Sequence, residues 1–286
     1  MRGRHTDPRW DALTYAQACV GRCERSADIV SMPPLHRLAA ALDGLSPAQG
    51  VVPRLWHWLL FQQWAAQSDL AADGHPRRGD FLPLLPEYSR RVWAGGRVDF
   101  CDELRVGDAI MRTSTIVGVN RKQGSSGSFV LVTIRHEIAG PRGLAVVEEQ
   151  DLVYRTRASV ATTIEPAPPP PPAALTRQLE IDSVLLFRFS ALTGNAHRIH
   201  YDLLYARDEE GYPERVVHSP LQAILLYDLL LRHDAKARAG RFVFRSLRPA
   251  YACNSLSLEA WRVETGWRLQ ARDPSGAICM VAQAQP

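Results

Sequence analysis

A run of prolines near the middle of the chain sets the strongest limit on how it can fold. Residues 168–172 are all proline, and Pro166 stands two positions before them. Proline fixes φ and lacks an amide N–H, so neither a helix nor a central strand continues through such a run. The segment is typical of a stiff, extended linker. We therefore expect two parts, residues 1–163 and 176–286, joined by a linker at 164–175.

The part after the linker has the pattern of one buried helix followed by antiparallel strands. Ser219 and Pro220 are typical of a helix start, as N-cap and as first helical residue. Apolar residues then recur around most of the helix, which predicts that it is buried. Apolar runs separated by turn residues predict three strands, preceded by a short apolar run at 242–247; the strands are expected at 256–263, 267–272 and 278–282.

The part before the linker repeats this order. Pro34 opens an expected helix at 36–42, which we match to the helix at Pro220. These prolines stand 186 positions apart (220 − 34), whereas the matched strand entries Glu103 and Pro249 stand 146 apart (249 − 103). The difference predicts about forty extra residues in the first part, an insertion at about 45–98. Strands are expected at 110–119, 128–137 and 144–154.

A helix wrapped by an antiparallel sheet is the hot-dog plan, and this chain has the pattern twice. The sequence therefore predicts an α+β protein with a tandem, or double, hot-dog fold.

Bulk composition excludes several classes of protein. With 46% hydrophobic and 22% charged residues, the chain is typical of a soluble globular protein. Its net charge of +4 is dispersed, which argues against nucleic acid and suits an anionic ligand such as CoA. Five scattered cysteines without a Cys-x-x-Cys pair indicate free thiols in a reducing compartment. No apolar run is long enough to cross a bilayer, and no signal core follows the basic start, so we expect a cytoplasmic protein.

Residues 189–202 are the most informative segment for function. Their sequence, FSALTGNAHRIHYD, crowds small, polar and imidazole side chains between apolar runs. A buried core has no use for that mixture, whereas a site that holds and deprotonates a water molecule does. The segment therefore predicts an active site in the second part.

This segment resembles the hydratase motif of the MaoC-like hot-dog enzymes. The stretch from Asn195 to Asp202 is most similar to the subgroup of double hot-dog mesaconyl-CoA hydratases and mitochondrial-type 3-hydroxyacyl-thioester dehydratases. The likeness extends over nearly the whole chain, through further motifs of that subgroup at 73–76, 79–83, 93–96, 148–151 and 211–218.

The resemblance implies reversible hydration or dehydration of an enoyl thioester without a cofactor. Its most specific form is hydration of mesaconyl-C4-CoA to citramalyl-CoA. It also implies that the second part supplies the chemistry and the first part walls off the substrate. Three alternatives stay open: a 3-hydroxyacyl-ACP or -CoA dehydratase, a hot-dog thioesterase, and a non-catalytic acyl-CoA-binding subunit.

His200 and Asn195 are the expected catalytic pair. Imidazole titrates near neutral pH, so His200 is the natural base for water. Single hot-dog relatives have Asp where this chain has Asn195, and a carboxamide orients water without usefully exchanging a proton. We therefore expect a one-base mechanism, in which the protonated ring or an exchanged water delivers the second proton. A purely structural histidine and a turn-forming asparagine are the alternative interpretations.

The start of the second helix is the expected oxyanion site. The first N–H groups of a helix are unpaired and its dipole is positive there. Because Pro220 has no N–H, we expect Ser219 to donate to the thioester oxygen, although relatives usually have Gly at this place. Arg198, and after it Arg91, are the expected partners of a substrate carboxylate, and a structural ion pair is the alternative for Arg198.

The remaining expectations concern substrate contacts, metals and assembly. His218 is expected near the thioester or CoA, and Tyr201 is a weaker substrate-binding candidate that packing also explains. His197, His200 and Asp202 have a spacing that metal ligands adopt, but no outside ligand is evident and we expect no metal. A tandem chain satisfies hot-dog pairing internally, so a monomer and a homodimer both remain open.

Overall fold

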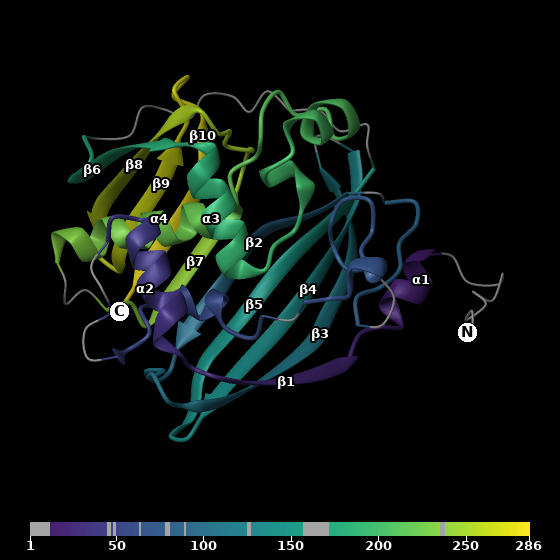
Figure 1. Cartoon of the computed structure of the whole chain (residues 1–286), viewed down its shortest axis with the longest axis horizontal. Coiled ribbons are helices and arrows are strands. Elements are labelled where there is room, and N and C mark those ends of the chain that lie inside the picture. Colours follow the sequence, from purple (N-terminus) through teal and green to yellow (C-terminus); the bar gives the residue numbers. More distant parts are fainter. Residues whose placement is uncertain are drawn as a thin grey trace.

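The computed structural model describes residues 12–44, 47, 50–62, 64–77, 81–88, 90–124, 127–156, 172–234 and 238–286. Within them, the chain forms one antiparallel sheet of ten strands (Figure 1). In chain order these are β1 (Cys23–Ile29), β2 (Arg90–Phe100), β3 (Ala109–Gly124), β4 (Gly127–Gly140), β5 (Gly143–Arg155), β6 (Leu175–Ile181), β7 (Arg241–Ser246), β8 (Asn254–Val263), β9 (Gly266–Arg272) and β10 (Ile278–Gln285). The predicted strands of both parts are therefore confirmed, and β1, β2 and β6 are strands that the sequence pattern did not predict.

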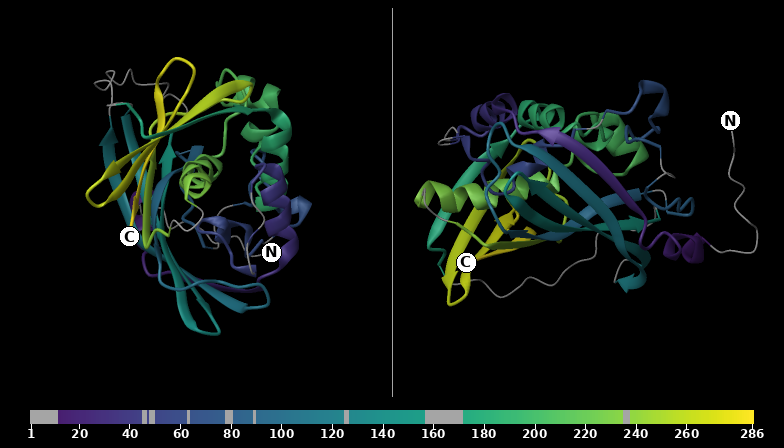
Figure 2. Two further views of the ribbon diagram at one scale, coloured as in Figure 1. Left: turned by 90° about the vertical axis from the view of Figure 1, so that its left-hand side faces the viewer. Right: turned by 90° about the horizontal axis from the view of Figure 1, so that it is seen from below.

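The helices are few and unequal in length. They are α1 (Ala12–Gln17), α2 (Met32–Ala41), α3 (Ser183–Thr193) and α4 (Ser219–His233), with short turns η2 (Trp56–Leu59), η3 (Gln67–Asp69), η4 (Arg198–His200) and the π-helical η5 (Tyr205–Glu209). Figure 2 shows the sheet curving around α4, with α2 and α3 on the other side of that helix.

The strand order reads the same from either edge of the sheet. From one edge it runs β1-β3-β4-β5-β2, and from the other β6-β8-β9-β10-β7. The two halves meet where β2 pairs with β7, with Gly96 opposite Phe244. A side chain at Gly95 would stand 2.5 Å from the Phe244 carbonyl oxygen, so glycine permits this close approach. The chain thus contains the same antiparallel plan twice, fused into one sheet.

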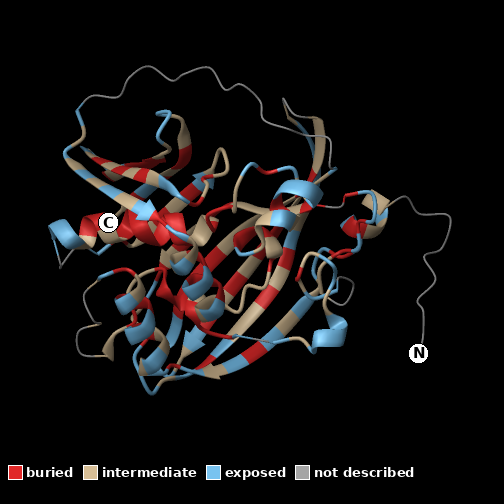
Figure 3. Ribbon diagram, turned by 45° about the horizontal axis from the view of Figure 1, so that its top comes forward, coloured by how far each residue is buried: buried red, intermediate tan, exposed pale blue. Residues whose placement is uncertain are grey.

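α4 is the central helix of the molecule. Its apolar residues recur on nearly every side, and between its ends every residue from Leu221 to Leu230 except Asp228 is buried (Figure 3). Burial of a helix on all sides follows from that pattern, because no face is polar enough to prefer water. The predicted start is wrong by one residue. His218 is the N-cap, so Ser219 and Pro220 are the first and second helical residues.

The predicted match between the two halves is wrong. β1 runs into α2 just as β6 runs into α3, so the partner of α2 is α3 and not α4. With that alignment, 48 residues separate α2 from β2 (42 to 89) and 47 separate α3 from β7 (194 to 240). The predicted forty-residue insertion therefore disappears. The error arose because Pro34 and Pro220 open helices that do not correspond: Pro34 lies in α2, the helix directly after β1, whereas Pro220 lies in α4, which follows α3 in the other half. In the described residues between α2 and β2, the longest helix is the four-residue η2.

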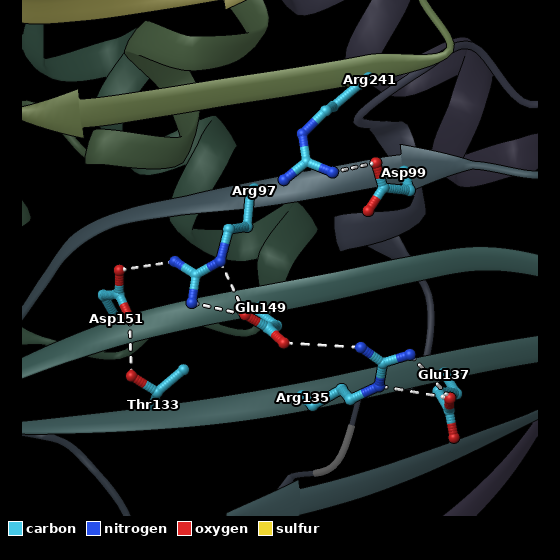
Figure 4. Close-up of polar contacts among 8 residues, drawn as sticks. All are labelled: Arg97, Asp99, Thr133, Arg135, Glu137, Glu149, Asp151 and Arg241. Atoms are coloured by element: carbon cyan, nitrogen blue, oxygen red, sulfur yellow. Dashed lines mark hydrogen bonds and ion pairs between the residues drawn. The ribbon is translucent and has the colours of Figure 1, made fainter. Parts of the chain in front are cut away.

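A row of ion pairs crosses the junction of the halves on one face of the sheet (Figure 4). Asp99 of β2 lies opposite Arg241 of β7 and accepts a 2.8 Å hydrogen bond from it. Arg97 bonds Glu149 at 2.6 Å and Asp151 at 3.0 Å, and Glu149 also meets Arg135. Such directly opposite pairs favour this register, each by a few tenths of a kcal/mol up to about 1 kcal/mol.

Two further expectations concern the linker and the membrane. β6 begins at Leu175, the last residue of the predicted linker, and residues 157–171 lie outside the described residues. Among the described residues, no helix combines the length and apolar character that a membrane crossing needs.

Candidate active site

The segment 189–202 leaves α3 and turns sharply. Gly194 ends α3 with φ of 60°, a left-handed conformation that favours glycine. The Asn195 side-chain oxygen then accepts a 3.0 Å hydrogen bond from the His197 N–H. This Asx-type turn fixes the direction in which the chain enters η4. Asn195 is therefore both a turn residue and a lining residue of the cavity described below, so its two interpretations are compatible.

His200 is buried with its two ring nitrogens in different environments. Nδ1 lies 2.7 Å from the carbonyl oxygen of Val216. A carbonyl only accepts, so the proton belongs on Nδ1, and Nε2 carries the free electron pair. Burial lowers the pKa of His200 to about 4, although the bond to Val216 opposes that shift. At neutral pH the ring is thus uncharged and able to accept a proton.

His218 supports His200 from behind. The two rings are stacked, with centroids 3.6 Å apart and an interplanar angle of 18°. His218 Nε2 lies 2.9 Å from the Ser190 hydroxyl of α3, while its buried Nδ1 has no hydrogen-bond partner among the described residues. Complete burial holds the pKa of His218 well below its usual range. Since His218 is also the N-cap of α4, it places His200 beside the start of that helix.

The start of α4, whose first backbone N–H is that of Ser219, lies beside this pair. Gln222 N–H bonds the His218 carbonyl, and Pro220 has no N–H. The Ser219 hydroxyl accepts a 2.9 Å hydrogen bond from Ser246 of β7. That bond ties the Ser219 side chain to the sheet while leaving its backbone N–H at the positive end of a fifteen-residue helix.

A cavity of about 610 Å³ connects these groups with the first half of the chain. Five of the predicted site residues line it: Arg91, Asn195, His200, His218 and Ser219. Four further histidines, none of which was predicted as a site residue, line it as well: His57, His75, His136 and His197. The volume suits the acyl part of a small ligand, and the lining comes from both halves.

Two predicted substrate-binding residues lie outside this lining. Arg198 is bound to Asp202 at 2.7 Å and to the Ala72 carbonyl at 3.1 Å, and it lies over the ring of Tyr205. Tyr201 is 47% exposed and donates to the Ala196 carbonyl. Both side chains therefore fasten the motif from outside. Arg198 stands directly before the buried Ile199 and His200, but its guanidinium already bonds Asp202 and the Ala72 carbonyl.

A loop of the first half is clamped onto the motif. The Arg198 N–H donates to the Asp73 carbonyl at 2.9 Å. Gly74, with φ of 90°, lies so close that an added Cβ would stand 1.9 Å from the Ala196 oxygen. Next to it, both oxygens of Asp73 accept hydrogen bonds from His75, one from the backbone N–H and one from Nδ1. Sequence similarity pointed to residues 73–76 but did not place them in the site.

The first half contributes a second buried polar cluster. Glu148 accepts hydrogen bonds from Trp58 at 2.8 Å and Gln150 at 3.0 Å, and lies 3.2 Å from His57 Nε2. Burial alone would raise the pKa of Glu148, but these partners hold it below its usual range. His136 lies nearby, and burial lowers its pKa to about 4. From the sequence, the cluster at 56–58 is expected to pack in the core or to line an acyl pocket; its bond to Glu148 could not be expected, because that residue lies 90 positions away.

The group of residues whose geometry could suit a metal differs from the one that the sequence spacing suggested. Asp202, one of the three spaced candidates, is bound to Arg198 and also accepts from the Tyr205 N–H. The structure instead gathers Asp73, His75 and His197, whose ligand atoms lie within 4.8 Å of one another. Because both Asp73 oxygens accept from His75, this group stands as a hydrogen-bonded cluster.

Comparison with known proteins identifies relatives across nearly the whole chain. Residues 55–252 match the family model "Hydroxyacyl-thioester dehydratase type 2". The chain is 41% identical over 272 residues to a mesaconyl-C(4)-CoA hydratase of Chloroflexus aurantiacus, covering 94% of this chain and 96% of that protein. It is 26% identical over 266 residues to a mitochondrial hydroxyacyl-thioester dehydratase type 2 of Schizosaccharomyces pombe, covering 81% and 87%.

Solved structures share the fold at low sequence identity. A MaoC-like dehydratase from Phytophthora capsici superposes with a TM-score of 0.69 at 12% identity, covering 95% of this chain and 98% of that chain. A Mycobacterium tuberculosis protein described as having a double hotdog fold superposes with a TM-score of 0.56 at 13% identity, covering 93% and 96%. The expected α+β double hot-dog fold is thereby confirmed.

Proposed function

Because the chain belongs to the hydroxyacyl-thioester dehydratase type 2 family of MaoC-like hot-dog enzymes, we propose that it reversibly hydrates an enoyl-CoA thioester. The preferred substrate is mesaconyl-C4-CoA, which yields citramalyl-CoA. The identity of 41% to a mesaconyl-C(4)-CoA hydratase over nearly the full length of both chains supports this choice. The enzyme is a hydro-lyase without a cofactor.

The position of His200 carries the proposal. Its Nδ1–H is held by Val216, which directs the basic Nε2 to a water molecule in the cavity. Asn195 orients that water. As His200 removes a proton, the hydroxide adds to the β-carbon and negative charge moves to the thioester oxygen. The Ser219 N–H, at the positive end of α4, stabilises this oxyanion. A proton transfer to the α-carbon completes hydration.

Arg91 is the proposed partner of the substrate's free carboxylate. It lines the cavity, and its charge is close enough to lower the pKa of His197, behind burial and the neighbouring histidines. Among the described residues, no carboxylate makes an ion pair with Arg91. Arg198 takes the structural role, because its donors already bind Asp202 and Ala72.

The enzyme is proposed to act in the cytoplasm, with the catalytic half at 176–286 and the substrate-shaping half at 1–163. The pairing of β2 with β7 inside one chain supports a monomer as the functional unit, with a homodimer of such chains as the alternative.

A panel of unsaturated CoA esters, with and without a distal carboxylate, tests the proposal. Hydration removes the conjugated double bond, so loss of its ultraviolet absorbance reports turnover directly. His200→Ala should lower kcat by about 10²- to 10⁴-fold, as loss of a general base does, while thermal unfolding stays close to that of the wild type. Binding of a thioester without any absorbance change would mean a non-catalytic acyl-CoA-binding protein.

A 3-hydroxyacyl-thioester dehydratase is the second candidate function. The family description and the Schizosaccharomyces pombe relative favour it. Efficient turnover of crotonyl-CoA or longer acyl chains, with none of the dicarboxylic thioester, would select this candidate. Matched assays with acyl-ACP distinguish the carrier. Release of free thiol would instead indicate a thioesterase.

A further inference from the structure

The proposed hydration needs two proton transfers, and the predicted site supplies only one group able to make them. His200 takes a proton from water. Asn195 carries a carboxamide, which neither gains nor loses a proton near neutral pH. His218 stacks on His200 and bonds Ser190 through Nε2, and burial holds its pKa well below its usual range, which disfavours the protonated form that an acid needs. Tyr201 is not among the residues that line the cavity, and its hydroxyl donates to the Ala196 carbonyl. A one-base mechanism would return the proton from His200 itself or from an exchanged water; a second acid–base group elsewhere in the cavity is the alternative.

His75 of the first half is the group that the fold brings there. Its ring lies 4.3 Å, centroid to centroid, from His197, whose ring lies 5.6 Å from that of His200. All three rings line the same cavity. His75 is also less enclosed than His200, with about one fifth of its side chain exposed. The three imidazoles thus form a row that runs from the more exposed His75 through His197 to the buried His200.

Asp73 gives His75 the form of an acid–base dyad. The Asp73 carboxylate lies 3.1 Å from His75 Nδ1, so the proton there is held and Nε2 is the reactive nitrogen. Burial alone would raise the pKa of Asp73, but the bonds and charge of His75 hold it well below its usual range. A permanent carboxylate at Nδ1 stabilises the imidazolium of His75, as it does in other Asp–His pairs of acid–base catalysis.

The loop that carries His75 and Asp73 is also held against the motif at 195–202 by several contacts. Gly74 approaches Ala196 too closely for any side chain, and the Arg198 N–H bonds the Asp73 carbonyl. Arg198 reaches further to the Ala72 carbonyl. These three contacts join the loop to a motif more than 120 positions away in the chain, and they fix the position of His75 relative to that motif.

We propose that His75, held by Asp73, is the second acid–base group of hydration and protonates the α-carbon. This rests on the proposed function. His200 accepts one proton from water while the oxygen bonds the β-carbon and the double-bond electrons form the enolate. The enolate pair then takes the Nε2 proton of the His75 imidazolium, and the thioester carbonyl reforms. The proton on His200 returns to His75 past His197, so one water is added and both rings are restored.

His75→Gln is the principal test, because glutamine keeps a polar side chain but transfers no proton. The variant should lose about 10²- to 10³-fold in kcat with KM changed by no more than about twofold. Enzyme-catalysed exchange of the product's α-hydrogen with deuterated water, followed by mass spectrometry, should fall by the same factor. Added imidazole should restore activity to His75→Ala, which a purely structural role would not permit.

Asp73→Asn and Asp69→Asn form a matched pair. Both remove one carboxylate from the same loop, but Asp69 is exposed and has no place in the cavity lining. Asp73→Asn should lower kcat and α-hydrogen exchange, whereas Asp69→Asn should leave both unchanged. Thermal unfolding of each variant shows whether the loop stays in place.

Two outcomes would overturn the inference. A His75→Gln enzyme with kcat within about threefold of the wild type removes His75 from proton transfer. A raised KM for the dicarboxylic thioester alone, with kcat kept, makes the dyad a carboxylate-binding site instead. Both require that the wild type hydrates an enoyl-CoA and that His200→Ala abolishes this activity. If the wild type has no such activity, it is the proposed function that fails.

Discussion

At the scale of single residues, the contacts of Arg198 and Arg91 favour Arg91 as the proposed partner of the substrate carboxylate, although the sequence favoured Arg198. Arg198 belongs to the motif, but its guanidinium donates hydrogen bonds to the Asp202 carboxylate and the Ala72 carbonyl. Arg91 lies outside the motif and lines the cavity. A guanidinium whose donors are already satisfied gains little by exchanging them for a ligand, whereas an uncommitted one gains a charge-assisted hydrogen bond.

Arg91→Gln should therefore raise KM for the dicarboxylic thioester by about 10- to 100-fold, the effect of losing one hydrogen bond to a charged group. KM for crotonyl-CoA, which has no second carboxylate, should change by less than about twofold. Arg198→Gln is the matched variant and should lower thermal stability without this substrate preference. A loss specific to the dicarboxylic substrate in Arg198→Gln would reverse the assignment.

At the scale of elements, the first-half loop at 71–77 and the motif in the second half act as one unit. Their contact depends on Gly74, where both the backbone conformation and the space exclude a side chain. Gly107 has nearly the same conformation, with φ of 94° against 90°, but nothing lies within 4 Å of its would-be Cβ. The pair separates backbone strain from steric exclusion.

Gly107→Ala should lower the free energy of unfolding by about 1–2 kcal/mol, the usual cost of a left-handed backbone for a residue with Cβ, and leave kcat unchanged. Gly74→Ala carries the same strain and also pushes the loop away from Ala196. It should lose at least about tenfold in kcat as well, because a small displacement of catalytic groups is costly. Equal kinetics in the two variants would show that the loop plays no part in turnover.

At the scale of the whole molecule, burying histidines in one cavity makes stability depend on acid. Burial, as the main cause, lowers the pKa of His136 and His200 to about 4, and it holds the pKa of His197 and of His218 well below the usual range. In the unfolded chain each returns to about 6.5. The unfolded state therefore binds more protons, and stability must fall as pH drops from about 6.5 toward 4.

Urea unfolding at pH 7.5, 6.0 and 5.0 measures this effect. Each histidine that is neutral in the folded state and protonated in the unfolded state lowers the free energy of unfolding by at most about 1.4 kcal/mol per pH unit. The free energy of unfolding should therefore already fall steeply at pH values above those at which carboxylates titrate. Glu148, whose pKa lies below its usual range, loses its contribution only at lower pH. His136→Gln should flatten the slope between pH 6.0 and 5.0. Constant stability from pH 7.5 to 5.0 would contradict the prediction.

The sequence alone predicted much of this protein, wherever the evidence was local. The turn at Gly194 and Asn195, the buried character of α4 and most strands follow from residues within a few positions of one another. Such signals are complete in the chain, because capping, alternation and helical periodicity act over one or two turns. The motif around His200 is local in the same sense, and it pointed to the correct family.

Only the tertiary structure decided which side chains of the first half meet those of the second half in the cavity. His75 and Asp73 precede His200 by well over a hundred positions, and Glu148 meets Trp58 across ninety. Which helices correspond in the two halves depends on the strand that precedes each of them. The match of Pro34 with Pro220 was wrong because that strand order was not known from the sequence. Long-range contacts are settled by packing of the complete sheet around α4. No local pattern encodes them, so the composite cavity appears only when the two halves are assembled.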